Sequence, residues 1–265
     1  MATVLLLRHG RTTANADGTL AGHQPTELDD VGRAQAAAVG ARLVAAGLAP
    51  HLVVTSPLLR CRQTVDVALP NATVVEDARL VECDYGDWSG KPLKTLAKQP
   101  LWQVVQAHPS AAAFPGGESM AAMSARAIAA IRDADARATR EHGPGAVVLV
   151  CSHGDVIKAI VADAMGLHLD LFQRLSVDPA SLTVIRYTPL RPFLLRLNDV
   201  GGDLAGIKPP KPRRGRARWS TSDAEVGGGA GADGPAAAPA VSAESHATGV
   251  DRGSNAGNDR IVSNT

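Results

Sequence analysis

Near its N-terminus the sequence reads VLLLRHGRT over residues 4–12. Its four leading apolar residues form a short continuous run, which predicts a strand covered on both faces. The polar residues Arg8 and His9 follow this run directly. Five further apolar or β-branched runs predict strands at residues 52–55, 73–75, 146–151, 182–187 and 193–197. The last two flank a pair of prolines and are typical of a late hairpin-like pair.

Segments with helical features lie between these strands. Ser56 is a candidate N-cap and Pro57 a candidate first helical residue. Met120 and Met123 begin an apolar pattern with a spacing of three to four residues, typical of an amphipathic helix. The predicted helices cover residues 31–46, about 56–68, a segment from Met120 that ends before Gly143, and about 155–166. Strands that alternate with helices indicate the α/β class, a three-layer α/β/α sandwich around a mostly parallel central sheet.

The composition divides the chain into two parts. Residues 1–200 hold the periodic and apolar segments and suit one α/β domain. Residues 201–265 are rich in Gly, Ala, Pro, Ser and Asp and hold few large apolar side chains. Such a segment buries too little apolar surface to offset its chain entropy, so we expect a disordered, low-complexity tail. Within it, residues 208–219 form a basic segment without an acidic residue.

The overall composition disfavours several classes of protein. Among 265 residues, 27 Lys and Arg balance 26 Asp and Glu, and aromatic residues make up 3%. Neither a strong electrostatic field nor a base-stacking surface is therefore expected, so the basic tail segment is the one candidate for nucleic-acid binding. No apolar run approaches the roughly 20 residues of a membrane span. The N-terminus lacks a secretory pattern, so we expect a cytoplasmic protein without membrane association. The three cysteines form no CxxC pair, which disfavours a disulfide scaffold or a structural zinc site.

Polar residues after three of the predicted strands indicate where the chemistry lies. Arg8 and His9 follow the first strand. Arg60 lies shortly after the second strand, and His153 follows a later one. The carboxyl ends of parallel strands meet at one edge of a sheet, where ligands bind. Arginine binds phosphate oxygens bidentately, a neutral imidazole can attack phosphorus, and Glu82 is a candidate proton donor to the leaving oxygen. The sequence thus predicts phosphoryl transfer through a histidine, without a metal or cofactor.

Five motifs of the chain resemble those of the histidine phosphatase superfamily, on its phosphoglycerate mutase-like branch. The motifs are LRHGRTTAN at residues 7–15, SPLLR at 56–60, Glu82 with YGDWSG at 85–90, GGES at 116–119 and SHG at 152–154. The resemblance covers roughly residues 3–187. It implies a phosphoglycerate mutase-like fold, a phosphohistidine intermediate on His9, proton donation by Glu82 and no metal. It also implies phosphoryl binding by Arg8, Asn15, Arg60 and His153.

Three functions remain open from the sequence. We expect a phosphatase, in which water hydrolyses the phosphohistidine formed from a small phosphomonoester. The alternative is a phosphomutase of the phosphoglycerate mutase type, in which the intermediate returns its phosphoryl group to a bound monophosphate. The modest segment between Glu82 and Glu118 favours hydrolysis because a short lid leaves the site wetter. The third function is non-catalytic binding of a phospho-ligand or nucleic acid. A homodimer is a possible assembly.

Individual residues also allow two interpretations. Asp84 is the alternative to Glu82 as proton donor, and Asn15 either binds phosphate or caps a turn. Arg11 stands where many family members carry Glu or Gln, and we expect it to face outward.

Two groups of side chains near the proposed site are ambiguous in the same way. Four aromatic residues form either an apolar pocket wall or a small core under a long connection, namely Tyr85, Trp88, Trp102 and Phe114. The three cysteines each adjoin a proposed site residue. We expect them to be small buried side chains rather than oxidant-sensitive thiols.

Overall fold

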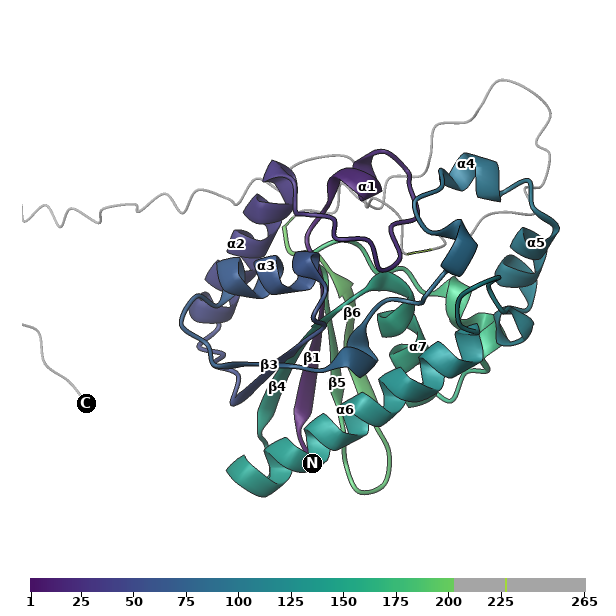
Figure 1. The fold of residues 1–265 in the computed structure, drawn as a ribbon. Helices are drawn as coiled ribbons and strands as arrows, with labels where there is room; N and C mark the ends of the chain where they lie inside the picture. The colour runs from purple at the N-terminus through teal and green to yellow at the C-terminus, as the bar shows by residue number, and fades with distance from the viewer. Residues whose placement is uncertain (203–226, 228–265) are drawn as a thin grey trace, which may run out of the picture.

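The computed structural model describes residues 1–202 and residue 227. Within that part of the chain, one sheet has the strand order β3-β2-β4-β1-β5-β6 (Figure 1). The strands are β1 (Thr3–Arg8), β2 (Leu52–Thr55), β3 (Val74–Glu76), β4 (Val147–Ser152), β5 (Leu182–Arg186) and β6 (Phe193–Asp199). The pairs among β1 to β4 are parallel, whereas β5 is antiparallel to both β1 and β6. The predicted mostly parallel sheet and the late hairpin are confirmed.

Helices connect the strands. The α-helices are α1 (Thr13–Ala16), α2 (Asp30–Ala45), α3 (Leu59–Ala68), α4 (Leu93–Leu96), α5 (Pro100–Ala107), α6 (Met120–His142) and α7 (Gly154–Ala164). Residues 1–202 also form the short 3₁₀ turns η1 (Ala78–Leu80), η2 (Gly86–Trp88), η3 (Pro109–Ala111) and η4 (Leu169–Arg174). The long helix α6 begins at the N-cap Ser119, whose hydroxyl accepts the backbone N–H of Ala122, and ends before Gly143 as the sequence predicts.

The helices cover both faces of the sheet. Side chains alternate across a strand, so β1 supplies Leu5 and Leu7 to one face and Val4 and Leu6 to the other. The first pair packs in a cluster with α2 and α3, and the second pair packs in a larger cluster with α6 and α7. Figure 1 shows these two helix layers on opposite sides of the strands. The predicted α/β/α sandwich is confirmed, and the two-sided burial explains why residues 4–7 are all apolar.

The start of α3 differs from the prediction. The N-cap is Leu58 rather than Ser56, and it makes no capping hydrogen bond through its side chain. Pro57 therefore lies before the helix instead of at its first position. The hydroxyl of Ser56 lies 2.8 Å from Nε2 of His153 and also accepts the backbone N–H of Leu58. Ser56 thus contacts His153, almost 100 positions away, instead of capping the helix. No local sequence pattern encodes this contact.

The predicted tail lies almost wholly outside the described residues. The basic segment 208–219 belongs to that part, so nucleic-acid binding by the tail stays a prediction, as does the domain boundary at residue 200. Within the described part of the chain, no helix has both the length and the apolar character that crossing a membrane requires.

Candidate active site

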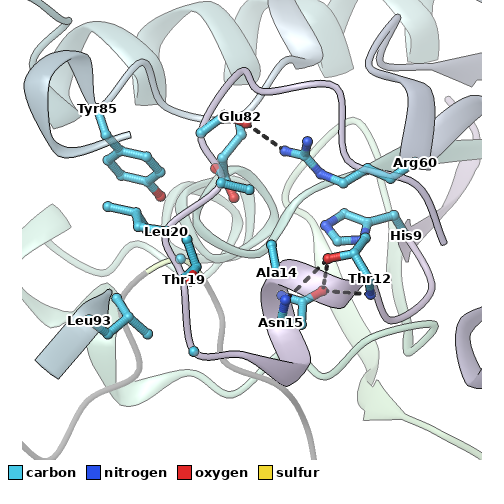
Figure 2. A pocket seen from close by; sticks show the side chains of 14 residues that line it. His9, Thr12, Ala14, Asn15, Thr19, Leu20, Arg60, Glu82, Tyr85 and Leu93 are labelled. Atoms are coloured by element: carbon cyan, nitrogen blue, oxygen red, sulfur yellow. Dashed lines mark hydrogen bonds between the residues drawn. The ribbon is translucent and has the colours of Figure 1, made fainter. Parts of the chain in front are cut away.

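The parallel pairing of β1 with β4 brings two histidines together. Arg8 at the end of β1 is in register with Ser152 at the end of β4, and a histidine follows each strand. The backbone N–H of His9 donates to the Ser152 carbonyl over 3.0 Å. The rings of His9 and His153 consequently lie with their centroids 5.3 Å apart. Figure 2 shows His9 facing a pocket that Arg60 and Glu82 also line.

The imidazole of His9 is oriented by its own loop. Its Nδ1 lies 2.7 Å from the Gly10 carbonyl oxygen. A carbonyl can only accept, so Nδ1 carries the hydrogen and Nε2 keeps its lone pair. Burial, followed by the positive charges of Arg60 and Arg8, lowers the pKa of His9 well below its usual value. At neutral pH the ring is therefore uncharged, with Nε2 able to act as a nucleophile.

His153 is buried deeper than His9, with no exposed surface. Its Nε2 lies 2.8 Å from the Ser56 hydroxyl, and the Cys61 sulfur lies 3.5 Å from the same nitrogen. Burial and the charge of Arg60 are the main causes that lower the pKa of His153 well below its usual value. The His153 ring is therefore an uncharged group that lies next to His9 and does not itself line the pocket.

Two buried arginines supply the positive charge of the site. Nη1 of Arg8 donates to the Val177 carbonyl over 2.7 Å, and Nη2 of Arg60 donates to the Gly22 carbonyl over 2.8 Å. Arg8 has no exposed surface and Arg60 has 2%. These carbonyl partners fix the guanidinium planes, so the charges are held in place before a ligand arrives.

Among the described residues that line the pocket, Glu82 is the one that carries a carboxyl group. Burial and the charge of Asp155 raise the pKa of Glu82 to about 7. Three groups oppose this shift: the Cys83 backbone N–H, which donates to Oε1 over 3.0 Å, and the charges of Arg60 and Arg8. A carboxyl group with this pKa carries a proton in a large fraction of molecules at neutral pH, as a general acid requires.

Asp84, the alternative proton donor, has a structural contact instead. Its Oδ1 accepts the backbone N–H of Gly86 over 3.0 Å, and its side chain does not line the pocket. Among the two carboxyl groups, the geometry favours Glu82.

An arginine that the motifs did not indicate holds the loop of Glu82. Arg126 on α6 donates to the carbonyl oxygens of Arg79, Val81 and Glu82 over 2.7, 2.7 and 3.0 Å. It also pairs with Glu118 of the GGES motif, whose Oε1 accepts the backbone N–H of Asp84. Arg126 and Glu118 together therefore anchor the segment that carries Glu82.

Asn15 lines the pocket and also caps α1. Its Oδ1 accepts the backbone N–H and the hydroxyl of Thr12, which forms a reciprocal capping box at this short helix (Figure 2). The amide oxygen thus acts in the turn. The amide nitrogen is the end of the side chain that suits a phosphate oxygen, so the two interpretations of Asn15 are compatible.

A sequence profile of the histidine phosphatase superfamily (branch 1) matches residues 4–200. The chain belongs to this superfamily. The glucosyl-3-phosphoglycerate phosphatase of Mycolicibacterium vanbaalenii is 35% identical over 174 residues, which are 63% of this chain and 76% of that protein. The 2,3-bisphosphoglycerate-dependent phosphoglycerate mutase of Methylobacterium sp. (strain 4-46) is 33% identical over 174 residues, 62% of this chain and 81% of that protein.

Solved structures agree with this assignment. A mycobacterial glucosyl-3-phosphoglycerate phosphatase, solved as a complex with VO3, superposes with a TM-score of 0.67 at 28% identity. The match covers 74% of this chain and 98% of that one. This histidine phosphatase is therefore an enzyme, a phosphatase or phosphomutase, rather than a non-catalytic binding protein.

The aromatic residues after Glu82 form a small core. The Tyr85 ring meets Phe114 edge-on at 5.0 Å, and Trp88 packs against both Phe114 and Trp102 at 5.3 and 6.1 Å. All four side chains are buried. Of the four, Tyr85 alone also lines the pocket. The four residues therefore form the small core that the sequence allowed, and Tyr85 in addition forms part of the pocket wall.

The cysteines and Arg11 match the plainer expectations. Cys61, Cys83 and Cys151 are free and buried, and burial raises the pKa of the Cys83 and Cys151 thiols, which disfavours reactive thiolates. Arg11 pairs with Asp29 at 2.7 Å, outside the pocket.

Replacement of Arg126 by Gln should release the Glu82 loop. We expect a loss of about 2 kcal/mol in the free energy of unfolding, because three carbonyl groups and Glu118 lose a charged partner. We also expect a 10- to 100-fold lower kcat on an alkyl phosphate. Urea unfolding and steady-state kinetics measure the two effects. Arg132→Gln on the same helix is the matched control, since its salt bridge to Asp163 is at the surface; equal effects of both variants would contradict the anchoring role.

Proposed function

We propose that this histidine phosphatase hydrolyses phosphomonoesters through a phosphohistidine on His9, with Glu82 as the proton donor. The residues that bind the phosphoryl group in this proposal are Arg8, Asn15, Arg60 and His153. The observation that carries it is the neutral His9 ring, which shares a pocket with Arg60 and with a protonatable carboxyl group. Arg8 is buried beside this pocket, and its charge acts on the same ring.

The reaction has two displacements at phosphorus. In the first, Nε2 of His9 attacks, the bond from phosphorus to the ester oxygen breaks, and Glu82 gives its proton to that oxygen. In the second, the Glu82 carboxylate takes a proton from a water molecule. The water oxygen attacks phosphorus, the P–N bond breaks, and inorganic phosphate leaves. Glu82 thereby regains its proton and His9 regains its lone pair.

The arginines stabilise charge on the phosphoryl oxygens in both steps. The guanidinium groups of Arg8 and Arg60 are already in place, so little reorganisation is needed when the transition state forms. Within residues 1–202 and 227, no three His, Cys, Asp or Glu side chains are grouped so that they could hold a metal ion. In this proposal the protein cations do the work that a metal does in other phosphatases.

A phosphomutase is the second candidate. It shares the first displacement, and the phosphohistidine then transfers its phosphoryl group to a bound monophosphate instead of water. The similarity to the Methylobacterium mutase supports it. Hydrolysis is favoured because the segment between Glu82 and the GGES motif is short and packs as a small core. An assay of both activities on the same preparation separates the two.

His9→Ala should lower the hydrolysis of p-nitrophenyl phosphate by more than 10³-fold, because no other pocket residue can replace the nucleophile. A chelator such as EDTA should leave the native rate unchanged. His142→Ala, at an exposed histidine on α6, is the matched control and should retain full activity. Strong inhibition by the chelator would contradict the metal-free mechanism.

Glu82→Gln should slow an alkyl phosphate at least 100-fold and p-nitrophenyl phosphate less than 10-fold, because only the poor leaving group needs a proton. The pH profile should follow the same carboxyl group. The native rate on the alkyl phosphate should fall as the pH rises through about 7, since deprotonation of Glu82 removes the acid. Equal losses on both substrates, or an alkaline limb that persists in Glu82→Gln, would exclude Glu82 as the donor.

A further inference from the structure

Asp155 is a buried carboxylate that the two displacements do not use. It lies in the first turn of α7, two residues after His153, and has no exposed surface. Asp155 does not itself line the pocket, and it meets the pocket through Tyr85 and Gly227, which do. Its Oδ2 accepts the Tyr85 hydroxyl over 2.7 Å and the backbone N–H of Gly227 over 3.2 Å. Its Oδ1 lies 3.9 Å from Nζ of Lys158, which also donates to Gln173 over 3.2 Å. The two oxygens therefore differ: Oδ1 faces the lysine, and Oδ2 faces Tyr85 and Gly227.

Gly227 lies in the pocket that a substrate would enter. It lines the same pocket as His9, Arg60 and Glu82. Its carbonyl oxygen accepts from Nη2 of Arg8 over 3.4 Å, while its N–H donates to Asp155. The backbone of Gly227 therefore accepts a hydrogen bond from Arg8, which binds the phosphoryl group in the proposed reaction, and donates one to Asp155.

A substrate must reproduce both contacts. The phosphoryl group needs Arg8, so its oxygens take the place of the Gly227 carbonyl. The N–H of the same residue then leaves Oδ2 of Asp155, and the buried carboxylate loses one of its two donors. A carboxylate buried with an unfilled lone pair is costly, and a second carboxylate or phosphate beside it is more costly still. A hydroxyl or ammonium group of the substrate restores the lost hydrogen bond.

The remaining lining of the pocket offers no compensation for a second anion. Arg60 is the one lysine or arginine among the described lining residues, and in the proposed reaction it binds the phosphoryl group. Lys158 is on the far side of Asp155, on the other carboxylate oxygen. Glu82 also lines this pocket and adds to the repulsion when it is ionised.

We propose that Asp155 selects the alcohol part of the substrate. The preferred substrate is a phosphomonoester whose alcohol carries a hydrogen-bond donor, hydroxyl or ammonium, close to the ester and carries no second anionic group. This inference rests on the proposed hydrolysis at His9 and adds the substrate class to it.

The test compares small phosphomonoesters on the native full-length chain. Glycerol 1-phosphate supplies a hydroxyl, phosphoethanolamine an ammonium, propyl phosphate no donor and phosphoglycolate a carboxylate. We expect kcat/KM for at least one donor substrate to exceed that of propyl phosphate about 10-fold, and phosphoglycolate to be the poorest. The first two substrates distinguish the two kinds of donor. Equal kcat/KM for all four, or a preference for phosphoglycolate, would overturn the inference.

Asp155→Asn tests the residue itself. An amide both donates and accepts, so the preference for the donor substrate over propyl phosphate should shrink to less than 3-fold and phosphoglycolate should improve relative to the others. The ratio of kcat/KM between two substrates reports on substrate recognition. An effect of Asp155 on the Glu82 pKa changes kcat/KM for all substrates and cancels in this ratio. Asp163→Asn, on the same helix and paired with surface Arg132, should keep the native ratios. Native ratios in Asp155→Asn would contradict the assignment, and thermal unfolding shows whether the variant is folded.

His9→Ala separates this inference from the proposed function. If His9→Ala loses turnover on all four substrates and the native enzyme has equal kcat/KM values for them, the proposed substrate class is wrong and the proposed reaction stands. Retained turnover in His9→Ala would remove the proposed reaction.

Discussion

Two arginine side chains sit at the carboxyl edge of the sheet almost without solvent contact, and their positive charge acts on every reactive group of the site. Together with burial, the charges of Arg8 and Arg60 keep His9 and His153 neutral. The same charges draw the Glu82 pKa downward, and burial with Asp155 more than offsets them. The same arrangement of charge thus leaves an imidazole with a free lone pair and a carboxyl group that can hold a proton in one site at neutral pH. This separation of roles among neighbouring titratable groups is what two-step phosphoryl transfer requires.

The fold holds these groups in place by long-range contacts. Parallel pairing of β1 with β4 joins His9 to His153 across about 140 residues of sequence. The Thr64 hydroxyl on α3 accepts the Gly10 N–H over 3.0 Å, which connects the loop after β1 to the helix of Arg60. Arg126 and Glu118 hold the Glu82 segment against α6. Each reactive side chain is therefore attached to a regular element, which suits a site whose geometry must be ready before the substrate binds.

The sequence predicted the sheet and the gathering of the site residues because both follow local rules. Continuous apolar runs predict buried strands, and polar residues after them fall at one edge. The contacts of Ser56, Arg126 and Asp155 were missed for the opposite reason. Ser56 resembles a helix cap, Arg126 resembles a surface charge on an amphipathic helix, and Asp155 resembles an ordinary first-turn acid. The contacts of Ser56 with His153, of Arg126 with the Glu82 segment and of Asp155 with Tyr85 join residues about 40 to 100 positions apart, and only the three-dimensional packing reveals them.

The stereochemistry at phosphorus tests the central claim most directly. The substrate is a phosphomonoester whose phosphorus is made chiral with the three oxygen isotopes. The enzyme transfers its phosphoryl group to an alcohol acceptor, and the configuration at phosphorus in the product is then measured. Two successive displacements, through a covalent group on His9, each invert phosphorus, so the account predicts net retention. Net inversion would show a single direct displacement and would contradict the phosphohistidine on which the proposed mechanism depends.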